Sequence, residues 1–170
     1  MAAMGATGSA RAADLRFGYI DSARIFQEFK EAQEAQARFD RQVQGWRDEA
    51  TEKEKAVNDL KTELRDQGPI LSSLKRQEKE EVLQRAISDY ERFIQDVWGP
   101  GGKASQENER FTAQVVTQIR VAVEKIAGDR DLNLVLDAAG GQIIYADPTL
   151  DLTSKVIEEL NSGVAGEGAE

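Results

Sequence analysis

The pattern that most constrains the fold is an apolar repeat in the first half of the chain, advancing by four and three residues in turn. Ten of its twelve positions are apolar, whereas composition alone would give about five. A mean period of about 3.5 residues is typical of a coiled-coil seam, and the charged residues between suit a solvent-facing surface. Residues 22–67 are therefore predicted to form one helix of roughly 70 Å. The positions are Ile25, Phe29, Ala32, Gln36, Phe39, Val43, Trp46, Ala50, Lys53, Val57, Leu60 and Leu64.

A second apolar repeat follows later in the chain and predicts a helix that runs back along the first. Gly68-Pro69 interrupts the helical pattern, because proline cannot continue a helix. Two amphipathic helices joined by a short break pair as an antiparallel hairpin, since each needs an apolar partner. We therefore predict a coiled-coil arm over residues 22–127, with its tip near 67–72 and a break at the glycine-rich 99–102. The returning positions are Leu83, Ile87, Tyr90, Ile94 and Val97, then Phe111, Val115, Ile119, Ala122 or Val123, and Ile126.

Short strands flank the predicted arm. Residues 16–20 are predicted to form one strand, and residues 132–136 and 142–146 a β-hairpin around Ala138-Ala139-Gly140-Gly141. A last helix is predicted from residue 151, and residues 162–170 are predicted to be a disordered tail. The head, residues 16–21 with 128–161, is too small to bury a core alone, so it is predicted to oligomerise. The predicted fold class is α+β, mostly α.

Composition excludes three kinds of catalytic site. The chain has no histidine and no cysteine, which excludes an imidazole base, a thiol nucleophile and a Cys/His zinc site. The Gly-Pro-Gly-Gly-Lys run at 99–103 departs from a phosphate-binding loop at Val97 and at Ala104. We therefore predict no enzyme, with no catalytic residue, cofactor or metal site.

The charge pattern argues against two classes of partner. The net charge is −9, and residues 128–170 hold 2 basic against 9 acidic side chains. Without a basic stripe, nucleic acid is not a predicted partner. No apolar run is long enough to span a bilayer, so stable membrane insertion is not predicted. Residues 1–15 are predicted to be disordered or the remnant of a signal peptide, because Ala10-Arg11-Ala12 resembles a small-x-small cleavage site.

The order of these features resembles the Skp/OmpH family of periplasmic chaperones, over residues 17–161. The resemblance implies a jellyfish-like homotrimer whose helical arms surround a cavity. It further implies that unfolded outer-membrane β-barrel proteins are held there without ATP during transit through the periplasm. The chain departs from the family in its acidic charge and in its break at 99–102. The motifs that carry the resemblance are Gly18-Tyr19-Ile20-Asp21-Ser22, the heptad hairpin, Leu134-Val135-Leu136-Asp137, Ile144-Tyr145-Ala146 and Asp151-Leu152-Thr153.

Apolar residues outside the seam are the predicted client contacts, and strand residues are predicted to build the oligomerisation head. The alternative is that these residues pack within the hairpin, the trimer junction or the tip turn, and that the chain is a structural or adaptor coiled coil without chaperone activity. A prefoldin-like holdase places its strands between its helices, whereas here the strands flank them. The client-contact residues are Phe26, Ile70, Leu71, Leu74, Phe93 and Trp98. The head residues are Phe17, Tyr19, Ile20, Leu134, Leu136, Ile143 and Tyr145.

Overall fold

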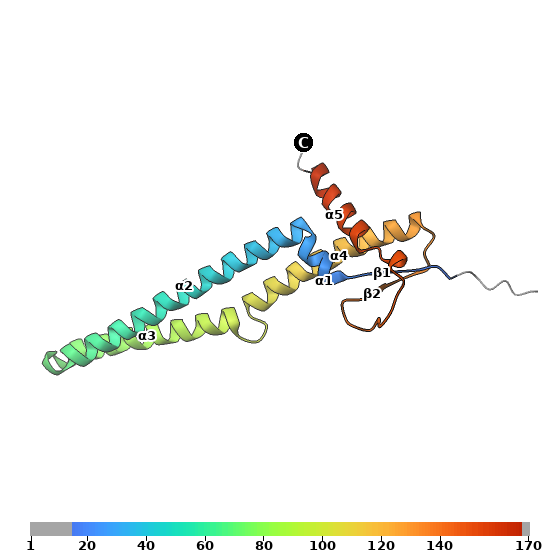
Figure 1. Cartoon of the computed structure of the whole chain (residues 1–170). Helices are drawn as coiled ribbons and strands as arrows, with labels where there is room; N and C mark the ends of the chain where they lie inside the picture. The colour runs from blue at the N-terminus through green and yellow to red at the C-terminus, as the bar shows by residue number, and fades with distance from the viewer. Residues whose placement is uncertain (1–14, 168–170) are drawn as a thin grey trace, which may run out of the picture. The chain divides into compact units, whose positions relative to one another are not determined.

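The computed structural model describes residues 15–167, with side chains for residues 15–163. The chain divides into two compact units (Figure 1). The arm unit comprises residues 30–116, and in the head unit the residues up to 29 pack with those from 117 onward. The segment predicted as disordered or signal remnant, residues 1–15, lies outside the described residues except for Leu15. None of the described helices is long and apolar enough to cross a membrane.

The arm unit is a helical hairpin, as predicted. Helix α2 (Lys30–Gln67) leads to a 3₁₀ turn, η1 (Gly68–Ile70), and α3 (Ser73–Trp98) returns along α2 (Figure 1). Pro69 lies in the first turn of η1, where its missing N–H has no partner to lose. The hydroxyl of Ser72 caps α3 by accepting a hydrogen bond from the amide of Lys75 at 3.4 Å.

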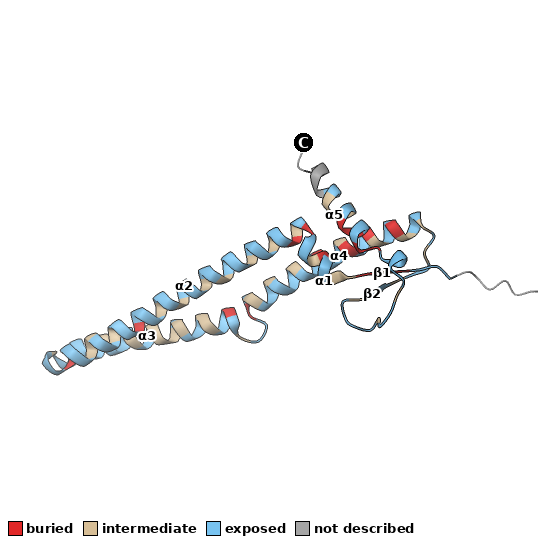
Figure 2. Cartoon of the chain, in the orientation of Figure 1, coloured by how far each residue is buried: buried red, intermediate tan, exposed pale blue. Residues whose placement is uncertain are grey.

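Burial along α2 follows the predicted seam. Ala32 and Val57 are buried, and Gln36 is the seam position that is exposed. Most residues between seam positions are exposed, so in Figure 2 α2 is largely pale blue with scattered tan and red turns. The 3.5-residue repeat was therefore a correct guide to the face that packs. The remaining seam positions of α2, all half-buried, are Phe39, Val43, Trp46, Ala50, Lys53, Leu60 and Leu64.

A glycine-rich loop separates α3 from α4 (Lys103–Asp129). Gly101 has a φ of +68°, a conformation that side-chain-bearing residues rarely adopt. A Cβ on Gly102 would lie 2.6 Å from the carbonyl oxygen of Val97. The loop therefore needs glycine for two separate reasons, backbone conformation and close approach.

The head unit contains a two-stranded parallel sheet. Strand β1 (Phe17–Ile20) pairs with β2 (Leu134–Asp137) in a register that aligns Phe17 with Leu134 and Tyr19 with Leu136. On its other side β1 forms an isolated bridge between Tyr19 and Asp151. The order is thus residue 151, β1, then β2.

The predicted β-hairpin of 132–136 with 142–146 is wrong. Residues 142–146 form no strand, and β2 takes β1 as its partner instead. The chain after β2 must pass to the far side of β1, where the amide of Leu152 donates to the carbonyl of Tyr19 at 2.8 Å. That crossing, through the turn η2 (Pro148–Leu150), draws 142–146 away from β2.

Two short helices complete the head unit. Helix α1 (Ser22–Glu28) is capped by Asp21, and α5 (Thr153–Glu167) packs against α1 and β1. Helix α5 continues to Glu167, so the tail predicted as disordered from 162 is helical up to that residue. The buried core residues of the head unit are Ile20, Ile25, Phe29, Ile119, Ala122, Ile126, Leu152, Thr153, Val156, Ile157 and Leu160.

The predicted single helix over 22–67 is interrupted at Phe29. This residue has an extended backbone (φ −77°, ψ 115°) between α1 and α2. Its side chain is buried, and the carbonyl of Glu28 accepts a hydrogen bond from the side-chain amide of Asn161 at 3.2 Å. Tertiary packing onto α5 thus overrides a heptad pattern that continues through the break.

Candidate functional site

The tip of the arm presents apolar side chains to solvent. Ile70 is 85% exposed and Leu74 is 68% exposed, while Leu71 is half-buried. The 3₁₀ turn places Ile70 at the end of the hairpin, and Leu74 follows in the first turn of α3. Three of the six predicted client-contact residues are therefore brought together at one end of the arm unit, and two of them lack the burial that a packing role would require.

Two further predicted contact residues form an aromatic cluster near the end of α3. The rings of Phe93 and Trp98 meet edge to face with centroids 6.0 Å apart. The ammonium of Lys53, on the facing helix α2, lies 5.3 Å from the centroid of Phe93. Phe93 is half-buried, whereas Trp98 is exposed. The cluster explains the lysine in the seam, because a cation over an aromatic face is attracted to it.

Phe26 belongs to the head unit rather than to the arm unit. It lies on α1 and is half-buried.

The parallel sheet has one buried and one solvent-facing side on β1. Gly18 and Ile20 are buried, and a Cβ on Gly18 would lie 2.6 Å from Leu152 Cδ1. The other side carries apolar side chains at its registered pairs, with Phe17, Leu134 and Leu136 exposed and Tyr19 half-buried. Ile20 is thus a core residue. The other side forms one apolar face, here called the sheet face, made of Phe17, Tyr19, Leu134 and Leu136.

The loop after β2 exposes further apolar residues. Tyr145 is 85% exposed and Ile144 is 99% exposed, while Ile143 is half-buried. Within residues 15–167, β2 has β1 as its only strand partner, so its outer edge carries unpaired backbone groups. An unpaired strand edge and exposed apolar residues are each typical of a surface that another chain covers.

A carboxylate ties the end of β2 to the start of α1. Asp137 accepts hydrogen bonds from the Ser22 hydroxyl at 2.6 Å, the Ser22 amide at 3.1 Å and the Ala139 amide at 3.0 Å. Burial raises the pKa of Asp137, but these hydrogen bonds outweigh it and hold the pKa below its ordinary value. Asp137 therefore has a structural role at the junction of strand and helix.

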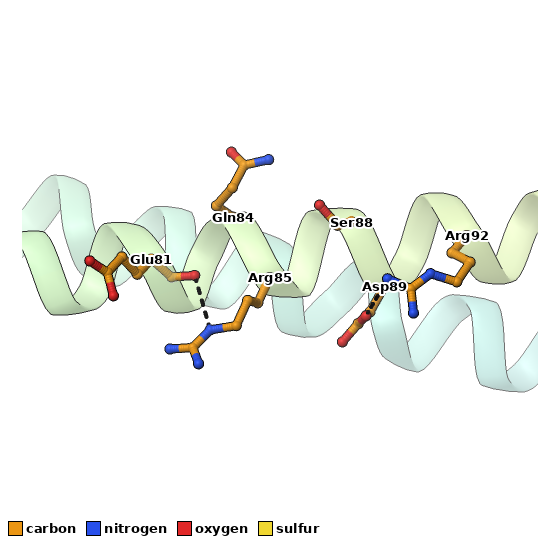
Figure 3. Close-up of a pocket in the computed structure, with 6 residues that line it drawn as sticks. All are labelled: Glu81, Gln84, Arg85, Ser88, Asp89 and Arg92. Atoms are coloured by element: carbon orange, nitrogen blue, oxygen red, sulfur yellow. Dashed lines mark hydrogen bonds and ion pairs between the residues drawn. The ribbon is translucent and has the colours of Figure 1, made fainter.

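The pocket in Figure 3 is a shallow polar hollow along one face of α3. Its side chains come from a single helix and interact locally: Arg85 donates to the carbonyl of Glu81 at 3.3 Å, and Arg92 pairs with Asp89 at 3.6 Å. Exposed local pairs of this kind do not create a catalytic environment. Within the described residues, no group of three or more acidic side chains could hold a metal ion.

Sequence reasoning missed several exposed apolar residues. Val82 on α3 and Val116 and Val121 on α4 are exposed, as is Ile144 in the loop after β2. The three valines lie on amphipathic helices but outside the apolar repeat. That mismatch with the seam positions was the sequence signal that could have identified them as exposed. Ile144 was hidden by the incorrect strand assignment.

Three comparisons with known proteins bear on identity. A family model described as outer membrane protein (OmpH-like) matches residues 16–160. Among solved structures, the chain is similar to one described as a candidate OmpH-like outer membrane chaperone from Caulobacter crescentus, with a TM-score of 0.77 at 15% identity. The match covers 96% of this chain and 92% of that one. The comparison with curated proteins gave no match. OmpH-like proteins are chaperones and not enzymes, and the family model spans most of this sequence, so the chain belongs to the OmpH-like family of outer membrane protein chaperones.

Proposed function

We propose that the chain is an ATP-independent holdase that binds unfolded outer-membrane β-barrel proteins in the periplasm and keeps them from aggregating. The observation that carries this proposal is the exposed apolar tip of a helical arm in a member of the OmpH-like family. Exposed apolar side chains on well-solvated helices can bind non-native segments weakly and at many points. The near balance of charge along residues 22–67, with 9 basic and 11 acidic side chains, keeps such a complex soluble.

We further propose that three copies assemble through the sheet face and the edge of β2. Closing the sheet with strands from other copies would cover Phe17, Leu134 and Leu136 and satisfy the edge. Residues 142–146, including the exposed Ile144 and Tyr145, would supply the added strand. Arms from three copies would then surround the client.

The holdase proposal is tested by light scattering. A urea-denatured outer-membrane β-barrel protein is diluted into buffer without ATP, with and without this chain. We expect suppression that saturates near one assembly per client. The paired substitutions Ile70→Ser and Leu74→Ser should weaken suppression, because they remove the two most exposed apolar side chains of the tip.

The control is the pair Val82→Ser and Val116→Ser, which also removes two exposed apolar side chains from the arm unit but leaves the tip intact. Equal loss in both pairs would show that the tip has no special role. Unchanged scattering with wild-type protein would favour the alternative, a structural or adaptor coiled coil.

The assembly proposal is tested by native mass spectrometry. We expect a trimer for the wild type and a monomer for Leu134→Asp combined with Leu136→Asp, because charges on the sheet face could not be buried. A trimer that survives these substitutions would place the interface elsewhere.

A further inference from the structure

The arm unit contains a pocket that two positions of the apolar repeat, Phe39 and Phe111, help to line. Helix α2 packs closely against α3 but approaches α4 less closely. Between α2 and α4 lies a cavity of about 200 Å³. Its lining residues are Ala35, Arg38, Phe39 and Gln42 from α2, and Glu107, Arg110, Phe111 and Gln114 from α4.

The two walls of this pocket carry the same residues at the same spacing. Arg38, Phe39 and Gln42 repeat the sequence Arg-Phe-x-x-Gln that recurs as Arg110, Phe111 and Gln114. On each helix these positions fall on one face, because they lie three, four and seven residues after a common starting position, Ala35 on α2 and Glu107 on α4. Each wall thus contributes one aromatic ring, one guanidinium and one amide. The walls differ at their fourth member, which is Ala35 on α2 and Glu107 on α4.

The size and lining of the pocket suit one aromatic ring. In volume it is comparable to an enclosed apolar cavity of about 150 Å³ that binds benzene, but five of its eight lining residues are polar or charged. The two phenylalanines supply apolar and aromatic surface for a third ring. The amides of Gln42 and Gln114 can each donate to and accept from the backbone of an extended peptide.

The two arginines are held only weakly by their present partners. Arg38 lies 4.0 Å from Glu34, and Arg110 lies 3.7 Å from Glu107. Both pairs are solvent-exposed neighbours on one helix, an arrangement that contributes little stability. Either guanidinium can therefore turn toward an incoming carboxylate, with which it forms paired hydrogen bonds.

We propose that this pocket binds an aromatic side chain of an unfolded client that lies next to a carboxylate. The two rings complement an aromatic occupant, and the two guanidiniums complement its negative charge once they turn from their carboxylate partners, Glu34 and Glu107. The inference rests on the proposed holdase function and specifies what kind of client segment the arm prefers. Residues Arg38 and Arg110 set the preference for charge, while Phe39 and Phe111 hold the ring.

The test uses the full chain and two small probes, 3-(4-fluorophenyl)propionate and its neutral amide, followed by fluorine NMR line broadening. Both probes should bind, and the carboxylate should bind about fivefold more tightly than the amide. Arg38→Gln combined with Arg110→Gln should abolish that preference while the amide still binds. Ala35→Trp should displace both probes, because its indole fills the pocket.

The matched control is Arg92→Gln. Arg92 precedes Phe93 on α3, so it has the same Arg-Phe sequence, but it does not line this pocket. It should leave both affinities unchanged. Absence of broadening with wild-type protein, retained binding in a folded Ala35→Trp variant, or equal loss with Arg92→Gln would overturn the proposal.

Probe binding is independent of aggregation suppression. A wild type that suppresses scattering but binds neither probe would refute the pocket and leave the holdase function standing. A wild type that binds both probes but suppresses nothing would refute the holdase function, and with it the role of the pocket in client selection.

Discussion

The head unit and the arm unit are stabilised in different ways. In the head unit, Ile25, Leu152, Thr153 and Val156 are almost fully buried. Its hydrogen bonds join distant segments, such as the amide of Asp21 with the hydroxyl of Thr153 at 2.9 Å. In the arm unit most seam residues are only half-buried, and many polar contacts join neighbours on one helix.

This difference follows from geometry. A pair of helices can cover each seam residue from one side only, so burial is partial but repeats along the whole length. A compact unit surrounds a few residues completely and depends on each of them. A mutation should therefore cost more in the head unit than an equivalent mutation in the arm unit.

The largest expected effect is that of Leu152→Ala. Removing this buried side chain from beneath Gly18 should destabilise the head unit by about 3 kcal/mol, whereas Leu60→Ala on the half-buried seam should cost about 1 kcal/mol. Hydrogen exchange of the β1 and α2 amides measures the two units separately. Similar costs at both positions would contradict the comparison.

A smaller loss of stability is expected in the glycine-rich loop between α3 and α4, where the arm unit is as closely packed as the head unit. Gly102→Ala places a methyl group against the backbone of Val97 and should cost about 2 kcal/mol. Gly101→Ala meets no neighbouring atom but must keep a positive φ, which should cost about 1 kcal/mol. Both tryptophans, Trp46 and Trp98, lie in the arm unit, so tryptophan fluorescence during urea unfolding reports these changes selectively. The reverse order of the two costs would show that the loop relaxes around the methyl group.

The same contrast explains what could be predicted from the sequence. The seam through Ala32, Val57 and Val97 was predictable because local periodicity determines which face of a long helix packs. The β-hairpin was mispredicted because strand partners depend on distant segments, and Leu152 bonds to Tyr19 across most of the chain. The break at Phe29 was missed for the same reason, since its cause lies in α5.

The candidate sites also differ in how far local sequence predicts them. Exposure of Ile70 and Leu74 followed from a sequence pattern, because apolar residues beside a proline turn have few neighbours. The Arg-Phe-x-x-Gln repeat was visible in the sequence, but its two copies gain meaning only when the fold places them across one pocket. Spatial pairing of distant motifs is beyond single-sequence periodicity.

The stability of the head unit should also depend on pH through Asp137, which joins distant segments of that unit. The pKa of Asp137 is lowered in the folded chain, so its contribution to stability is present above the unfolded pKa of about 4 and is lost as pH falls through the folded pKa. Asp137→Asn should cost about 0.5 kcal/mol at neutral pH, since the site is partly solvated. It should also flatten the acid-induced loss of protection in β2. An unchanged acid profile in the variant would assign that loss to other carboxylates.

The smallest effect concerns an ion pair that crosses the hairpin. Lys79 on α3 donates to Glu63 on α2 at 2.7 Å, and both side chains are about one-third exposed, at 32% and 38%. A double-mutant cycle with alanine should give a coupling of about 0.5 kcal/mol that decreases in high salt. The control is the Lys55–Asp59 pair at 3.4 Å, which stays on one helix and is more exposed, so its coupling should be smaller. Because the cross-hairpin pair joins residues sixteen apart, its coupling measures docking of α3 on α2 rather than helix formation. Equal coupling in the two pairs would mean that even this contact contributes only to local helix stability, and that the apolar seam alone holds the hairpin closed.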